Sequence, residues 1–269
     1  MDKPRLGGVR VFLAALAFAV PPPPATPLPE RPDSVADALA QTTSELHRAI
    51  DAWQAGPLAA GSTPRNVTLW ALHQQRLFLK LTYEPELGRH AGPLLSREAR
   101  ATLAARRRLV ELTPPTLLPL SSFRTGPALP AQTLLRYYRD AERRFGVDWE
   151  VLAAVNFVET GFNKLRSRSS AGAQGPMQFM PSTWRAYGLG GDVHAPRDAI
   201  LGAANYLRAS GAARDLRSAL WRYNHSQRYV EAVVTFAGQM RRDERAFFQY
   251  HAWQVFVKTP AGPRRITGP

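Results

Sequence analysis

The sequence predicts a mainly α-helical protein, and three observations support this fold class. Apolar residues recur every three or four positions through much of residues 34–113 and 131–242, a spacing that places them on one face of a helix. These windows end at breaks rich in glycine and proline, at 56–64, 85–93 and 113–130. A strand-like alternation stands at residues 253–257, which we expect to form a short strand or an ordered extension.

The first residues have the pattern of a secretory signal peptide. Three basic residues and one acidic residue precede a ten-residue apolar run at 11–20, and Ala17-Phe18-Ala19 fits the rule of small residues at a cleavage site. At about 1.5 Å per residue, the run is too short to cross a bilayer core of about 30 Å. We therefore expect residues 1–19 to be a signal peptide, with no transmembrane span after its cleavage. A fortuitous apolar start on a misassigned start codon is the alternative.

Residues 20–33 are predicted to be a proline-rich spacer, because seven of the twelve residues at 21–32 are proline. Residues 34–113 follow as an N-terminal helical segment, whose first helix keeps a 4-3-4-3-4 spacing of Val35, Leu39, Thr42, Leu46, Ala49 and Trp53. We expect these helices to pack as a layer on the rest of the chain, since three helices of this size make only a modest core alone. A separate three-helix bundle is the alternative.

A linker at 114–130 separates this segment from a second helical domain at 131–242, and residues 243–269 form a C-terminal extension. Within the second domain, helix start and stop signals accompany the apolar periodicity. Asp148 and Ser226 are predicted N-caps, and Gly161 is a predicted C-terminal stop. The helices expected there are 132–145, 148–159, 181–187, 196–209, 215–223 and 226–240.

Glu159 is the strongest candidate for a chemical role. It follows Val155 by four residues and Leu152 by seven, so its carboxylate should project from the side of the helix that packs inward. Removal from water raises the pKa of a carboxyl group and leaves it protonated near neutral pH, as a general acid requires. A glutamate in the last turn of the helix that swings out to solvent is the alternative.

The segment after Glu159 carries the pattern of a known family. The chain reads Glu159-Thr-Gly161, then Ser169-Ser-Ala-Gly-Ala-Gln-Gly-Pro-Met-Gln-Phe-Met-Pro-Ser-Thr-Trp184, and later Tyr223-Asn-His-Ser-Gln-Arg-Tyr229. These two ordered elements resemble the lytic transglycosylases of the lysozyme-like superfamily, most closely B-type and actinobacterial members, and the resemblance covers about residues 130–240. It implies a lysozyme-like helical catalytic domain with a substrate of peptidoglycan glycan strands.

The matching positions and their chemistry give a set of candidate site residues. Gln178 offers donor and acceptor groups to sugar hydroxyls or an acetamido group, and Tyr223 is placed to reach the Glu159 carboxyl. Gly172 and Gly175 should let the backbone approach a sugar closely. Apolar walls are expected from Met177, Phe179 and Trp184, for which a place in the core is the alternative. The substrate-binding candidates are Ser169, Met177, Gln178, Phe179, Tyr223, Asn224 and Tyr229, with Glu159 as the catalytic residue.

The resemblance implies a reaction that needs one carboxylate. Glu159 would protonate the oxygen between N-acetylmuramic acid and N-acetylglucosamine and then take the proton of the C6 hydroxyl, which leaves a 1,6-anhydromuramyl end. A hydrolytic muramidase needs a second acid, and Asp192 in the loop at 190–196 is the credible rival, with a turn-forming role as the other possibility. A non-catalytic wall-binding protein that keeps a lysozyme-like groove is the alternative from another class.

No cofactor is expected. The loop at 187–193 has one oxygen-rich side chain where a calcium loop needs several, and the six histidines show no metal-ligand spacing. The sequence contains no cysteine, which excludes disulfides and a thiolate nucleophile. We expect a monomer located in the cell wall, the extracellular space or the periplasm.

The chain is strongly basic, with a net charge of +14. Four of its 35 basic residues are lysine, so part of the bias towards arginine reflects genome composition. Such a field favours polyanions, including acidic wall polymers and the carboxylates of peptidoglycan stem peptides. No nucleic-acid-binding motif accompanies it, so no specific nucleic-acid partner is expected. A solvated helix face is the more common meaning of the arginine-rich run at 97–108.

Overall fold

The computed structural model describes residues 19–269, so the predicted signal peptide lies outside the described residues except for residue 19. Residues 20–31 precede the first helix and contact the second one. There the Arg76 guanidinium donates to the Thr26 carbonyl over 2.8 Å, and the Lys80 ammonium pairs with Glu30 at the same distance. From residue 19 onwards, no helix combines the length and the apolar character that crossing a membrane requires.

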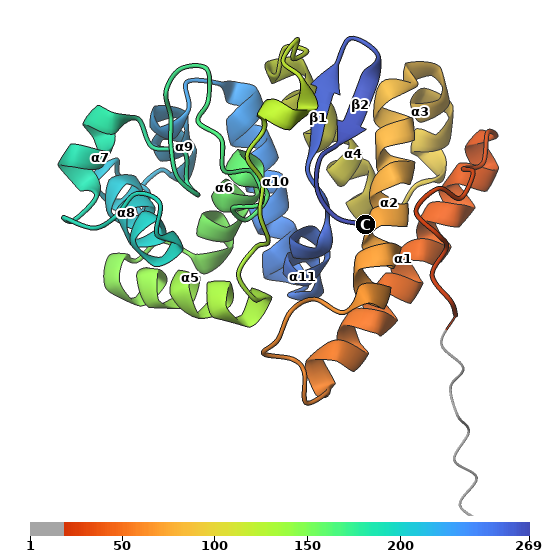
Figure 1. Cartoon of the computed structure of the whole chain (residues 1–269), viewed down its shortest axis with the longest axis horizontal. Coiled ribbons are helices and arrows are strands. Elements are labelled where there is room, and N and C mark those ends of the chain that lie inside the picture. Colours follow the sequence, from red (N-terminus) through yellow and green to blue (C-terminus); the bar gives the residue numbers. More distant parts are fainter. Residues whose placement is uncertain (1–18) are drawn as a thin grey trace, which may run out of the picture.

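The N-terminal half forms a helical layer at one end of the molecule (Figure 1). It consists of α1 (Pro32–Ala55), α2 (Arg65–Tyr83), α3 (Pro85–Ala91), a 3-10 turn (Gly92–Leu94) and α4 (Arg97–Leu112). The predicted break between helices at 85–93 is wrong, because most of these residues form α3. Pro85 begins α3 instead, because its missing N–H is one that the first turn of a helix leaves unpaired anyway.

The second half is also helical and closely follows the predicted boundaries. It contains α5 (Ala131–Phe145), α6 (Trp149–Thr160), α7 (Pro181–Tyr187), α8 (Pro196–Ala209), α9 (Leu216–Tyr223) and α10 (Gln227–Arg242). An unpredicted helix, α11 (Arg245–Ala252), follows. The chain ends in an antiparallel hairpin of β1 (Phe256–Thr259) and β2 (Gly262–Arg265), in which Phe256 pairs with Arg265. The mainly helical fold class is therefore confirmed.

Helix α6 lies in the middle of the molecule (Figure 1). Its residues from Glu150 to Asn156 are all buried, because α5, α8, α10 and α11 surround it. Helix α10 packs against α6 on one side and α4 on the other, while α1 and α2 pack against α11. One apolar core thus runs through both halves. The predicted packing of the N-terminal helices on the rest of the chain is confirmed, and a separate bundle is excluded.

Two neighbouring glutamines of α2 attach the C-terminal segment to the N-terminal layer. The Gln75 side-chain amide donates to the Gln254 carbonyl over 2.7 Å and accepts the Gln254 N–H over 2.8 Å. Gln74 accepts the indole N–H of Trp253 over 3.0 Å and donates to Gln249 over 3.2 Å. Both halves of the chain therefore contribute to this junction, and its buried amides are hydrogen-bonded.

The arginine-rich run on α4 is only partly a solvated face. Arg106 lies 5.0 Å from the centre of the Trp253 ring, and burial lowers its pKa to about 10. Arg107 donates to the Leu81 carbonyl over 3.0 Å. These two side chains therefore connect α4 to α2 and the C-terminal segment, whereas Arg97 remains exposed.

Candidate active site

The end of α6 places Glu159 at the edge of the core. Gly161 adopts the left-handed conformation, with φ of 58°, as the predicted helix stop requires. The N–H of Gly161 bonds to the Phe157 carbonyl over 2.9 Å, and the next N–H, of Phe162, reaches back to Asn156 over 3.2 Å. At the other end, Asp148 does not cap α6 with its side chain but pairs with Arg241 of α10. Glu159 therefore stands in the last turn of a helix that is fixed at both ends.

The Glu159 carboxyl has one hydrogen-bond partner among the described residues, the hydroxyl of Tyr229, which donates to Oε1 over 2.8 Å. Tyr229 lies in the first turn of α10, where the hydroxyl oxygen of Ser226 caps the helix as predicted. The Glu159 side chain is half-buried, so part of its surface stays open. Burial raises the pKa of Glu159 to about 7, and the Tyr229 hydrogen bond opposes this rise.

Tyr223 does not form the predicted hydrogen bond with Glu159. Its hydroxyl donates to the Met177 carbonyl over 2.7 Å. Its ring stands parallel to that of Tyr229, with an interplanar angle of 5° and 6.4 Å between the ring centres. Burial and, next, the negative charge of Glu159 raise the pKa of Tyr223 well above its usual range. Tyr223 therefore lies close to the acid but supports the loop at 174–179.

Gln178 lies on that loop in a constrained backbone conformation, with φ of +48°. Backbone hydrogen bonds between Gln174 and Phe179 close the loop, and the Gln178 amide donates to the Gly175 carbonyl over 3.0 Å. Glycine is required at position 175 by a close contact within the protein, not by contact with a sugar. A Cβ at this position would stand 2.0 Å from the Val193 carbonyl oxygen, so the close approach is to the protein backbone.

The residues expected as apolar walls lie at different depths. Met177 is 0% exposed and Phe179 is 2% exposed, so both side chains are core residues beneath the loop rather than walls of a substrate site. Trp184 is half-buried and packs edge-on against Phe179, with 5.1 Å between the ring centres. Tyr229 is also 2% exposed, which leaves its hydroxyl for Glu159 and little surface for a substrate.

Ser169 and Asn224 are both exposed. The Ser169 hydroxyl oxygen accepts the N–H of Ala173 over 3.0 Å, so this residue holds the tight turn at 169–173. Asn224 ends α9, and its side-chain amide forms no hydrogen bond within residues 19–269. Among the predicted substrate-binding residues, Asn224 thus has a side-chain amide whose donor and acceptor are not used by any other described residue.

A buried polar cluster next to Glu159 was not predicted. Asn156, one turn before Glu159, accepts the Tyr138 hydroxyl over 2.6 Å and donates to the Pro176 carbonyl over 2.8 Å. The Thr160 hydroxyl donates to the same carbonyl over 2.7 Å. The loop that carries Gln178 is therefore bound directly to α6 on both sides of Glu159. An asparagine within the apolar run at 151–158 was the available signal.

Asp192 serves the fold of its own loop. Its carboxylate accepts the N–H of His194 over 2.9 Å, and its own N–H donates to Asp198 over 3.0 Å. These are the bonds of a turn-forming aspartate. Across the described part of the chain, no three His, Asp or Glu side chains gather as a metal site would require.

Comparison with known proteins agrees with the motif. The family described as the transglycosylase SLT domain matches residues 136–242, which run from α5 to the end of α10. The membrane-bound lytic murein transglycosylase F of Thiobacillus denitrificans is 31% identical over 106 residues, which cover 36% of this chain and 22% of that protein. The chain thus matches about a fifth of the length of this relative. None of the solved structures matches the chain.

Proposed function

We propose that this chain, which carries a transglycosylase SLT domain in residues 136–242, is a lytic transglycosylase that cleaves peptidoglycan between N-acetylmuramic acid and N-acetylglucosamine. The single observation that carries the proposal is the state of Glu159. Its side chain is half-buried, burial raises the pKa of its carboxyl to about 7, and the Tyr229 hydroxyl holds it in place. A carboxylic acid with this pKa can donate a proton at neutral pH and accept one back.

The proposed reaction uses this one group twice. Protonated Glu159 donates to the glycosidic oxygen as the bond to the muramyl anomeric carbon breaks, and the muramyl acetamido group stabilises the positive anomeric centre. The Glu159 carboxylate then takes the proton of the C6 hydroxyl, whose oxygen bonds to the anomeric carbon. A 1,6-anhydromuramyl end forms, the new N-acetylglucosamine end carries a hydroxyl, and Glu159 regains its proton.

A hydrolase needs a second carboxylate, and the two acidic residues that follow the motif do not support that role. The Asp198 carboxylate accepts the Asp192 N–H, and the Asp192 carboxylate accepts the His194 N–H. A retaining or inverting hydrolase needs a carboxylate within about 5–10 Å of the acid to act as nucleophile or to activate water. The side chain that the Glu159 carboxyl contacts by a hydrogen bond is Tyr229, not a second acid. This arrangement favours attack by the C6 hydroxyl of the substrate itself.

The proposal is tested by mass spectrometry of the fragments released from purified peptidoglycan. We expect anhydromuramyl ends, which are lighter by one water than the reducing ends of a hydrolase. Glu159→Gln should reduce cleavage by about 10²–10⁴-fold and retain binding to the glycan, because the amide keeps the shape and cannot transfer the proton. Asp192→Asn is the matched control and should leave rate and products nearly unchanged.

Reducing ends as the main product would assign the chain to the hydrolases. Binding without cleavage by the unmodified protein would assign it to the wall-binding proteins. Because the proposed substrate lies outside the cytoplasmic membrane, we also propose that the protein acts there. Cell fractionation with an antibody to the chain tests this location.

A further inference from the structure

The segment predicted as a linker is bound along the loop that follows Glu159. Thr125 forms an isolated antiparallel bridge with Leu165. On either side of this bridge, the N–H of Gly126 donates to the Lys164 carbonyl over 3.0 Å and the N–H of Arg166 donates to the Arg124 carbonyl over 2.8 Å. Figure 1 shows the segment before α5 running along the front of the molecule past α6. The linker is therefore part of the domain surface.

This docking brings the linker close to the acid. The N–H of Leu165 donates to the Thr160 carbonyl over 3.0 Å, and Thr160 adjoins Glu159. The loop that pairs with the linker is therefore hydrogen-bonded back to the end of α6, one residue from Glu159. The arginines of the two paired segments therefore lie on the part of the surface that adjoins the end of α6.

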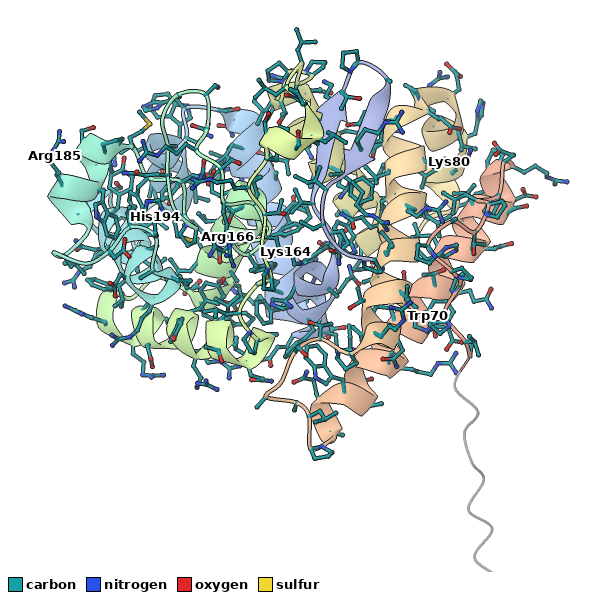
Figure 2. The ribbon with its side chains drawn as sticks, viewed as in Figure 1. Trp70, Lys80, Lys164, Arg166, Arg185 and His194 are labelled. Atoms are coloured by element: carbon teal, nitrogen blue, oxygen red, sulfur yellow. The ribbon has the colours of Figure 1, made fainter. Side chains whose placement is uncertain are left out.

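Three exposed arginines gather where the two segments meet: Arg124, Arg166 and Arg168. Arg166 donates to the Pro127 carbonyl over 2.9 Å, and Arg124 donates to the Arg166 carbonyl over 3.3 Å. Arg168 forms no side-chain hydrogen bond within residues 19–269, and none of the three has a carboxylate partner there. Figure 2 shows Arg166 and Lys164 on the same loop in the middle of the molecule.

The surrounding sequence supplies no counter-charge. Residues 112–139 and 160–191 contain neither aspartate nor glutamate, although the chain has 21 acidic residues elsewhere. These two stretches include the linker, the loop after Glu159 and the loop of Gln178. Elsewhere on the surface arginines commonly pair with acids, as Arg139 does with Glu244 and Arg228 with Glu111. The acid-free surface thus keeps three guanidinium groups available for an anion of another molecule.

We propose that Arg124, Arg166 and Arg168 bind the carboxylates of the stem peptides on the glycan strand that Glu159 cleaves. The proposal rests on the proposed function and adds a preference within it. Guanidinium groups pair with carboxylates through two parallel hydrogen bonds, and arginine on a surface attracts anions over about 8 Å at physiological salt. The sugars beside the scissile bond are then positioned partly through the peptides that branch from them.

The test compares two substrates with the same glycan and the same peptides. In one, the stem carboxylates are native, and in the other they are converted to amides with carbodiimide and ammonia. We expect the unmodified protein to have a KM about fivefold to tenfold lower for the native strands, since each exposed ion pair contributes up to about fivefold in affinity. This preference should disappear in 0.5 M salt, which screens exposed charges.

The double variant Arg124→Gln, Arg168→Gln should lose the preference while its cleavage of amidated strands changes less than twofold. Arg124→Lys with Arg168→Lys should keep most of the preference, because the charge remains. Arg97→Gln, on the exposed face of α4, is the matched control and should behave like the unmodified protein. Thermal unfolding by circular dichroism verifies that each variant is folded.

The inference would be overturned if the double glutamine variant kept the preference for native strands. It would also be overturned if the unmodified protein showed no such preference. Either result would leave the proposed function intact. Cleavage of neither substrate would instead count against the proposed function. Binding still tests the inference in that case, because the Glu159→Gln variant should sediment with native sacculi more strongly than with amidated sacculi. Equal binding to both would also overturn it.

Discussion

Burial and a hydrogen bond act on the pKa of Glu159 in opposite directions. Burial raises the pKa to about 7 and the Tyr229 hydroxyl lowers it, since that hydroxyl stabilises the ionised form. The proton donor is lost as the pH rises through this pKa, so cleavage should decline above about pH 7. Tyr229→Phe removes the lowering effect, and the decline should move to higher pH. The pH profile of kcat/KM, recorded for the unmodified protein and for the variant, measures the decline and its shift. A decline that moves to lower pH would contradict this account of the site.

The same raised pKa has a cost in stability. In the unfolded chain the Glu159 carboxyl ionises near pH 4.5, whereas in the folded protein it does so at about 7. The folded state therefore holds the proton more tightly, and the free energy of unfolding falls as the pH rises from 4.5 to 7. Glu159→Gln should stabilise the protein by about 1–3 kcal/mol at pH 8 and much less at pH 4. Urea unfolding at the two pH values measures this difference, and equal effects would exclude a buried, titrating carboxyl.

At the scale of elements, the contact between α6 and the loop at 174–179 depends on Asn156. Its amide joins the Tyr138 hydroxyl to the Pro176 carbonyl inside the core. Asn156→Ala should reduce the free energy of unfolding by about 2–4 kcal/mol, because it leaves buried polar groups without partners. Tyr138→Phe removes one donor and leaves the ring in place, so it should cost about 1 kcal/mol. Denaturant unfolding of both variants tests this order, and a reversed order would contradict it.

The helices of the second half could be predicted because their limits depend on local signals. Ser226 and Asp215 cap the helices that follow them, and Gly161 ends α6 in the left-handed conformation. Asp148 shows the limit of such signals, since its carboxylate pairs with Arg241, which is 93 residues away. Helix α11 was missed for a related reason. It has no side-chain N-cap, and its position is fixed by packing against α1, α2 and α6.

The motif predicts that Glu159, Gln178 and Tyr229 belong to one site, but it does not reveal which of them touch. The choice between Tyr223 and Tyr229 as the partner of Glu159 depends on how α9 and α10 sit against α6, which is a property of tertiary packing. Met177 and Phe179 could be read as walls or core from the sequence, and their burial decides for the core. The sequence spacing therefore proposes the members of the site, while tertiary packing decides which side chains touch.

At the scale of the whole molecule, the shared core implies that both halves unfold together. Residues 32–112 cover apolar faces of α10 and α11, and one core joins the two halves. We expect a single urea transition that coincides by far-ultraviolet circular dichroism and by tryptophan fluorescence. A fragment of residues 114–269 should lose this cooperative transition and aggregate. A fragment that melts cooperatively at the temperature of the full chain would show that the second half folds independently.

The reciprocal pair of Gln75 and Gln254 also affects the order in which the chain can fold. The two residues are 179 positions apart, so their contact closes a loop that spans most of the protein. Forming such a loop costs more entropy than forming any of the local helix pairs, and it requires that residue 254 has been synthesised. Helices α1 and α2 therefore remain incompletely packed while the ribosome is still adding α11 and the hairpin. Helices α1 and α2, although made before α11, complete their packing only after it.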